Sequence, residues 1–92
     1  MDQMQWEEKL TQMRTKEALR LRILQLCVEN NLSINALSAK CGITQSTLNN
    51  IVSGRNNSTT ISTVQKLCDG LNMTIPDFFD SDLFLDLEQE IL

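Results

Sequence analysis

The 92-residue sequence has no histidine and no tyrosine, and it contains one proline, three glycines and four aromatic side chains. Histidine is the commonest general acid–base group and metal ligand, and the three cysteines form no CxxC pair, so neither a catalytic centre nor a zinc site is indicated. A glycine-rich phosphate-binding loop is missing as well. Scarce aromatics and proline disfavour a β-sandwich and favour helices packed through Leu and Ile. We expect an all-α domain with no enzymatic activity, cofactor or small-molecule ligand.

Long apolar runs are also absent. No stretch approaches the ~20 apolar residues that a membrane-spanning helix needs. Asp2, Glu7 and Glu8 stand where a signal peptide would carry basic residues, so we expect a cytoplasmic protein with no membrane partner. Cys27 and Cys68 fall on helical faces otherwise lined by Leu, Ile and Val, which predicts small buried hydrophobes in a reducing compartment. A redox switch is the alternative.

Acids are missing from one long segment of the chain. The net charge is −4, yet the 39 residues between Glu29 and Asp69 contain no acid. Up to Glu29 the charges cancel, and from Asp69 onward there are seven acids and no base. Because local potential governs the approach of a phosphate more than total charge does, the acid-free segment suits a nucleic-acid surface. A chance gap is the alternative. The basic residues of the segment are Lys40, Arg55 and Lys66.

Capping residues divide the chain into short helices, and no segment alternates as a strand does. Ser33, Thr44 and Thr60 each precede an apolar periodic segment, and Gly42 and Gly54 follow such segments. The predicted helices cover about 16–30, 34–41, 45–53, 61–71 and 75–80. The predicted inward positions are Leu19, Ile23, Leu26, Leu37, Cys41, Leu48, Ile51, Ile61, Val64, Leu67, Cys68, Leu71, Ile75, Phe78 and Phe79.

The helix expected over 45–53 has an unusual outer face. An ordinary solvated helix carries Lys and Glu there, whereas this one carries amides and hydroxyls. Such groups both donate and accept hydrogen bonds, as the edges of bases do, and they do not repel phosphates. A merely solvated polar helix is the alternative. The residues of this face are Gln45, Ser46, Asn49, Asn50 and Ser53.

Several short motifs between about 20 and 80 resemble, in order and spacing, the Cro/repressor-type (XRE-like) helix-turn-helix DNA-binding family. They are Leu32-Ser33, Gly42-Ile43-Thr44, Ser46-Thr47-Leu48, Ile51-x-x-Gly54-Arg55, Leu71-x-Met73-x-Ile75 and Phe78-Phe79. The resemblance implies a five-helix lambda-repressor-like domain and a sequence-specific transcriptional regulator, a phage- or mobile-element-type repressor. Helix 45–53 would then read the major groove.

The resemblance also assigns roles to single residues. Bases would be contacted by Gln45, Ser46, Asn49 and Asn50, and phosphates by Thr44, Lys40, Arg55 and Asn57. The chain departs from the family at Ile34, where many members carry Gln or Glu. The phosphate contact that a side chain makes there is either lost or passes to Asn35. Many members carry Pro where this chain has Thr59.

Three parts of the chain are expected: an N-terminal helical extension (1–15), the helix-turn-helix domain (16–80) and an acidic amphipathic tail (81–92). The extension is either continuous with the next helix or separated from it by a break at Thr15. Both ends carry apolar residues that a minimal core does not need, so they either fold back or form a homodimer surface. The expected partners are double-stranded DNA and a second copy of the chain. A protein–protein adaptor or antitoxin on the same scaffold is the alternative. The surplus apolar residues are Trp6, Leu10, Met13, Leu83, Phe84, Leu87 and Ile91.

Overall fold

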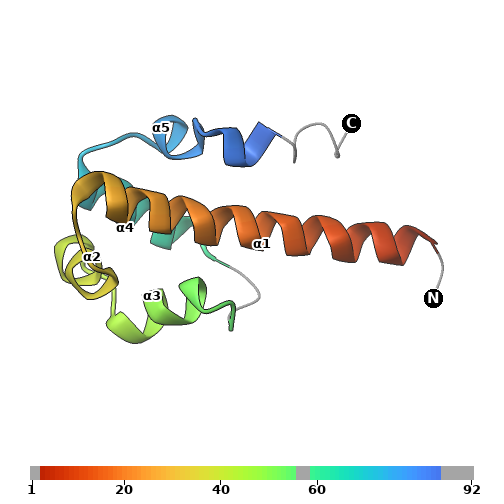
Figure 1. The fold of residues 1–92 in the computed structure, drawn as a ribbon, viewed down its shortest axis with the longest axis horizontal. Coiled ribbons are helices and arrows are strands. Elements are labelled where there is room, and N and C mark those ends of the chain that lie inside the picture. Colours follow the sequence, from red (N-terminus) through yellow and green to blue (C-terminus); the bar gives the residue numbers. More distant parts are fainter. Residues whose placement is uncertain (1–2, 56–58, 86–92) are drawn as a thin grey trace.

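One long helix, α1 (Gln3–Asn30), runs the length of the fold (Figure 1). The computed structural model describes residues 3–55 and 59–85, and for residues 3–14 it describes the backbone alone. No strand occurs in these ranges, which confirms the all-α prediction. The helices that follow α1 are α2 (Ile34–Cys41), α3 (Gln45–Val52), α4 (Ile61–Leu71), α5 (Ile75–Phe79) and a 3-10 turn, η1 (Asp82–Phe84).

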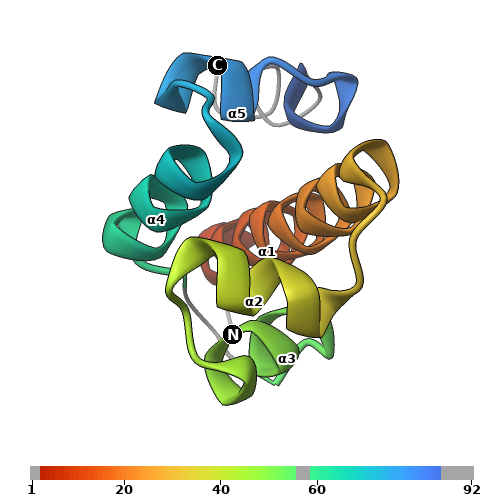
Figure 2. The same ribbon diagram turned by 90° about the vertical axis from the view of Figure 1, so that its left-hand side faces the viewer.

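The shorter helices surround the C-terminal half of α1. Seen nearly along α1 (Figure 2), α2 crosses near its C-terminal end, α3 lies on one side, and α5 with η1 lies on the opposite side. Contacts join α1 to α2, α3 and η1, and join α4 to α2 and α5. The core therefore sits between α1 and a shell of short helices, and α3 lies at the outer edge of that shell.

Caps set the helix ends largely as the sequence predicts. The hydroxyls of Ser33, Thr44 and Thr60 each accept a hydrogen bond from the backbone N–H three residues later, at 3.1–3.3 Å. Gly42 (φ 67°) and Asn72 (φ 56°) end α2 and α4 in the left-handed conformation. Two predicted ends shift by one residue, since α3 stops at position 52 and α5 at position 79.

Thr15 marks no helix boundary. It lies inside α1, so the N-terminal extension and the helix expected over 16–30 form one continuous element. The physical reason is that no Gly or Pro interrupts this stretch, and a threonine within a run of good helix formers lowers helix propensity by only a few tenths of a kcal/mol. Of the two alternatives for residues 4–29, the structure therefore selects the single helix.

The core consists mainly of the predicted apolar positions, with two corrections. Ile61, expected to point inward, is 65% exposed, because it occupies the first turn of α4 at the edge of the domain. Phe79 is 39% exposed at the end of α5. Leu19, Leu71 and Ile75 are only partly buried, against the edge of the core. The remaining predicted positions are buried: Ile23, Leu26, Leu37, Cys41, Leu48, Ile51, Val64, Leu67, Cys68 and Phe78.

Arg22 is a core residue that the sequence analysis did not single out. It is only 6% exposed. Its Nε donates to the backbone oxygen of Phe78 at 2.6 Å and its Nη2 to that of Asp77 at 2.9 Å. A third bond runs from Nη1 to Gln25 Oε1 at 2.6 Å, and the guanidinium lies 5.8 Å from the Phe78 ring centroid. This side chain therefore ties α1 to the last turn of α5.

Gly70 allows α4 to lie against α2. A Cβ at this position would lie 2.8 Å from the Cα of Cys41, closer than real Cβ contacts come. The Cys41 thiol also points at the Leu67 backbone oxygen, with a sulfur–oxygen distance of 3.8 Å. Because α2 and α3 share the turn at position 42, this close crossing also helps to position α3.

Part of the apolar surplus near the C-terminus folds back. Phe84 is buried and Leu83 partly buried, and η1 packs on α1. The rings of Phe78, Phe79 and Phe84 contact one another, with centroids 5.0–6.4 Å apart. The side chains of the other surplus residues, Trp6, Leu10, Met13, Leu87 and Ile91, lie outside the described part of the chain.

The three cysteines are buried free thiols. For Cys27 and Cys68 this confirms the expectation of small core residues. Burial raises the pKa of the Cys27, Cys41 and Cys68 thiols, chiefly by desolvating the thiolate. Since the thiolate is the reactive form, all three should be inert in the folded protein.

Candidate nucleic-acid interface

The turn between α2 and α3 is tight and internally bonded. Gly42 adopts the left-handed conformation, and its N–H points back to the backbone oxygen of Ser38. The N–H of Ile43 donates to the same oxygen at 3.0 Å, and the Ile43 side chain is buried. This arrangement sets two eight-residue helices at a steep angle with a short turn between them, which is helix-turn-helix geometry.

The inner face of α3 is anchored and its outer face is polar. Leu48 is fully buried and Ile51 is 5% exposed, so α3 has a defined rotation about its axis. On the outer side, Gln45, Ser46 and Asn49 are exposed and Asn50 is partly exposed. The side chains of these four residues make no hydrogen bond or ion pair with any residue in the described ranges. Their donors and acceptors are therefore available to an external partner.

Thr44 begins α3. Its Oγ1 accepts from the N–H of Thr47 at 3.2 Å and donates to Thr47 Oγ1 at 2.7 Å. The first turn of α3 contains no acid. Free N–H groups and the positive end of the helix dipole therefore face outward without a carboxylate to neutralise them, and such a helix end favours a nearby anion.

The other predicted phosphate contacts flank this motif. Lys40 is exposed in the last turn of α2, and Asn35 is exposed in its first turn. Arg55 is exposed just after α3, and its N–H donates to the Asn50 backbone oxygen at 2.9 Å. Neither Lys40 nor Arg55 forms an ion pair within residues 15–55 and 59–85. Asn57 lies outside the described residues.

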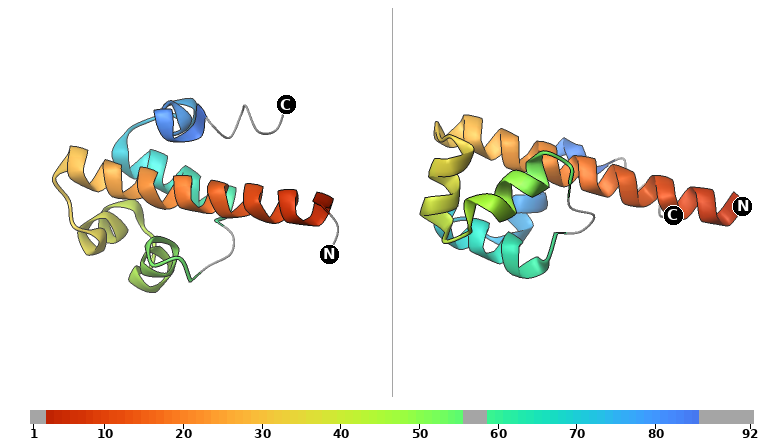
Figure 3. Two further views of the ribbon diagram at one scale, coloured as in Figure 1. Left: turned by 45° about the vertical axis from the view of Figure 1, so that its right-hand side comes forward. Right: turned by 90° about the horizontal axis from the view of Figure 1, so that it is seen from below.

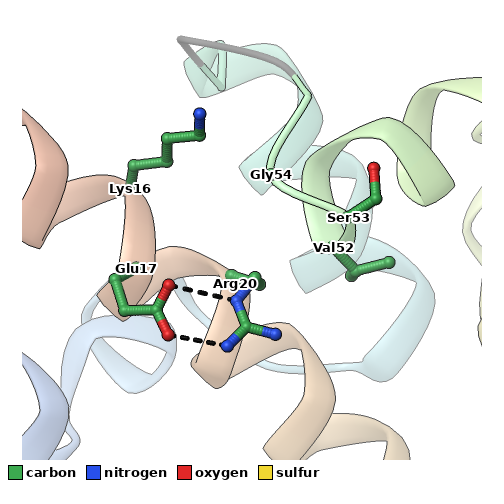
Figure 4. A pocket seen from close by; sticks show the side chains of 6 residues that line it. All are labelled: Lys16, Glu17, Arg20, Val52, Ser53 and Gly54. Atoms are coloured by element: carbon green, nitrogen blue, oxygen red, sulfur yellow. Dashed lines mark hydrogen bonds and ion pairs between the residues drawn. The ribbon is translucent and has the colours of Figure 1, made fainter.

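Two basic residues of α1 lie beside α3 although they are far from it in sequence. Lys16 and Arg20 face the end of α3 across an open pocket of about 350 Å³, which Figure 4 shows. The sequence did not predict that basic residues of α1 would lie beside α3, because the charges of the first 29 residues cancel. The residues that line the pocket are Lys16, Glu17, Arg20, Val52, Ser53 and Gly54.

Acidic residues collect on the other side of the fold. The left view in Figure 3 places α5 and η1 across α1 from α3, as Figure 1 does. Asp80 and Asp82 are exposed on that far side. Part of the charge segregation seen along the sequence is therefore also a segregation in space, and among the described residues that line the pocket beside α3 the one carboxylate is Glu17.

The comparisons with known proteins agree with this geometry. Residues 22–82, about two thirds of the chain, match the family model of the Cro/C1-type HTH DNA-binding domain. Among solved structures, the crystal structure of the prophage Lp1 protein 11 is similar, with a TM-score of 0.66 and 34% sequence identity. The alignment covers 73% of this chain and 88% of that one. No curated protein matches the chain.

The described helices include none long and apolar enough to cross a membrane. The matched region begins at Arg22 and ends at Asp82, so it contains the whole of α2, the turn and α3. The helix-turn-helix resemblance read from the sequence motifs is thus confirmed. The chain belongs to the Cro/C1-type helix-turn-helix DNA-binding family.

Proposed function

We propose that this protein is a sequence-specific DNA-binding transcriptional regulator, of the repressor type found in phages and mobile elements, that acts in the cytoplasm without enzymatic activity. The observation that carries the proposal is the outer face of α3, where four uncharged polar side chains have no partner among the described residues and the helix is anchored by its buried inner face. The similarity to a prophage protein supports the assignment to phages and mobile elements.

The dimensions of α3 suit the major groove. Eight residues at 1.5 Å each make a helix about 12 Å long, similar to the ~12 Å width of the groove. Gln45, at the first helical position, reaches furthest toward base edges, with Ser46, Asn49 and Asn50 beside it. Gln and Asn pair in bidentate fashion with adenine, so we expect A·T pairs at the contacted positions.

Phosphate contacts would hold α3 in register. Thr44 and the free N–H groups at the start of α3 suit one phosphate. Lys40 and Asn35 on α2 suit a phosphate on one side of the groove, and Arg55 and Asn57 suit one on the other side. Such contacts raise affinity and fix orientation, whereas base contacts supply the specificity.

We also propose that the protein acts as a two-fold homodimer. One copy of α3 exposes four base-reading side chains, which is too few to outcompete non-specific sites, whereas two linked copies multiply their binding. The expected contact surface is the N-terminal extension, aided by the exposed side chains of Phe79 and Leu85. Trp6 is the only tryptophan of the chain, so its fluorescence should shift on dimerisation.

Selection of bound duplexes from a random DNA pool tests the proposal. The full chain should enrich a palindromic or near-palindromic site, with half-sites about one helical turn apart. A Gln45→Ala variant should bind with relaxed preference at one base step, whereas Arg55→Ala should weaken all sequences alike. If the unaltered chain enriches no site, the protein is not a sequence-specific regulator. A protein–protein adaptor or antitoxin on this scaffold would then be the function to pursue.

A further inference from the structure

The pocket between α1 and the end of α3 has no role in the function proposed so far. Lys16, Glu17 and Arg20 line one side, and the last residue of α3 with the two residues after it (52–54) line the other. Its volume of about 350 Å³ compares with ~30 Å³ for each molecule of liquid water, so it has room for a phosphate group with several waters.

The charges at this pocket favour an anion. Lys16 is partly exposed and forms no ion pair with any described residue. Arg20 is held by Glu17 through bonds of 2.6 Å from Nη2 and 3.1 Å from Nε, and its Nη1 has no partner among the residues whose side chains the structure describes. This pairing lowers the pKa of the Glu17 carboxyl, chiefly through the hydrogen bond from Arg20. The lining therefore carries two positive charges and one negative charge, and the exposed Arg55 follows directly after it.

The pocket also lies where a DNA strand would pass. When the first turn of an eight-residue helix reads base edges, its last turn lies about 12 Å away, near the edge of a groove of that width. The sugar–phosphate backbone runs along that edge. Ser53 and Gly54 directly follow α3 there, and Lys16 and Arg20 lie beside them on a different helix.

We propose that this pocket binds a DNA backbone phosphate, with Lys16 as its main cation and Arg20 as a second donor. The inference rests on the proposed function, since it adds a contact from α1 to the DNA complex. Glu17 orients the guanidinium of Arg20 and at the same time weakens the site by its charge. Because a phosphate carries no sequence information, this contact raises the affinity for every DNA sequence alike.

The test measures the salt dependence of DNA binding by the full chain. Each phosphate contact contributes about 0.9 to the slope of log affinity against log salt, so Lys16→Gln should flatten the slope by about that amount. The affinity lost between 50 and 200 mM salt should then shrink about threefold, equally on a selected site and on a scrambled duplex. Glu17→Gln should act in the opposite direction and tighten binding, an outcome that a structural role would not produce.

Two variants serve as controls. Lys66→Gln removes one exposed positive charge from α4, which lines no part of the pocket, and should leave the slope nearly unchanged. Lys16→Arg keeps the charge and should keep the slope of the unaltered chain. This second control separates the charge of Lys16 from any effect on folding, which thermal unfolding of each variant monitors.

Three other results would separate failure of this inference from failure of the proposed function. If the unaltered chain binds DNA but Lys16→Gln and Arg20→Gln keep its slope, the inference is wrong and the proposed function stands. If inorganic phosphate stabilises the unaltered chain more than chloride at equal ionic strength, and Lys16→Gln abolishes this while keeping the DNA slope, the pocket takes a free anion and not DNA. If the unaltered chain binds no duplex at all, the proposed function fails and the inference falls with it.

Discussion

Replacing Arg22 by methionine removes a buried guanidinium while keeping an unbranched side chain of similar length. The structure assigns this side chain two hydrogen bonds to backbone oxygens at the end of α5, from Nε to Phe78 and from Nη2 to Asp77. Position 22 is only 6% exposed, so water cannot easily replace the lost donors. The perturbation is therefore the loss of the link between α1 and α5, with little change in packing volume.

The expected cost follows from these bonds. Hydrogen bonds that involve a charged group contribute about 1.5–3 kcal/mol each, and a buried carbonyl left without a partner costs about 1–3 kcal/mol. The desolvation of the guanidinium, which methionine avoids, offsets part of this loss. We expect Arg22→Met to lower the free energy of unfolding by about 2–4 kcal/mol, which corresponds to at least about 10 °C in melting temperature for a domain of this size. Arg22→Lys should lose about half as much, because one ammonium cannot reproduce the two-pronged geometry.

Chemical denaturation followed by far-ultraviolet circular dichroism measures this free energy. Arg20→Met is the matched control, since among the described residues its guanidinium is bound only to Glu17, on the surface of the same helix. This variant should leave the melting curve nearly unchanged. If Arg22→Met unfolds within about half a kcal/mol of the unaltered chain, α5 is held by its phenylalanines and not by the arginine, and the reasoning is refuted.

Four further outcomes are expected. Gly70→Ala should destabilise the domain by about 1–2 kcal/mol in the same assay, because overpacking against Cys41 outweighs the gain in helix propensity; unchanged stability would mean that the two helices can separate freely. Leu48→Ala should cost about 2–4 kcal/mol and abolish DNA binding near physiological temperature, as a gel-shift titration would detect. Gln45→Ala should keep full stability but lose about 1–3 kcal/mol of specific binding, and an unaltered preferred site would exclude its base-reading role. Burial raises the pKa of all three cysteine thiols, so the folded protein keeps them protonated while the thiols of the unfolded chain ionise above the ordinary pKa of 9.0. The free energy of unfolding should therefore decline as the pH rises past that value, and replacing a buried cysteine by alanine should reduce the slope of this decline.

Local interactions allowed the helix boundaries and the inner face of most helices to be predicted from the sequence. A helix cap is a local contact between a hydroxyl and the backbone N–H three residues later, so Ser33, Thr44 and Thr60, each just before an apolar periodic segment, mark helix starts without knowledge of the fold. Gly42 tolerates the left-handed turn for an equally local reason. Apolar spacing then gives each helix an inner face. Because Leu48 marks the inner face of α3, the opposite face, with its amides and hydroxyls, could be assigned to the outside from the sequence.

The tertiary structure alone decided what depends on partners distant in sequence. From the sequence, Arg22 was indistinguishable from the other charged residues of its helix. Only its contacts with residues 55 and 56 positions away make it part of the core. Ile61 matched the apolar spacing of α4, yet its position on the rim of the domain leaves it exposed. Lys16 and Arg20 belong to a stretch whose charges cancel, and only the packing of α1 beside the end of α3 makes them part of a pocket there. Spacing along a chain encodes the face of each helix, whereas the neighbour that the face meets depends on how the helices pack.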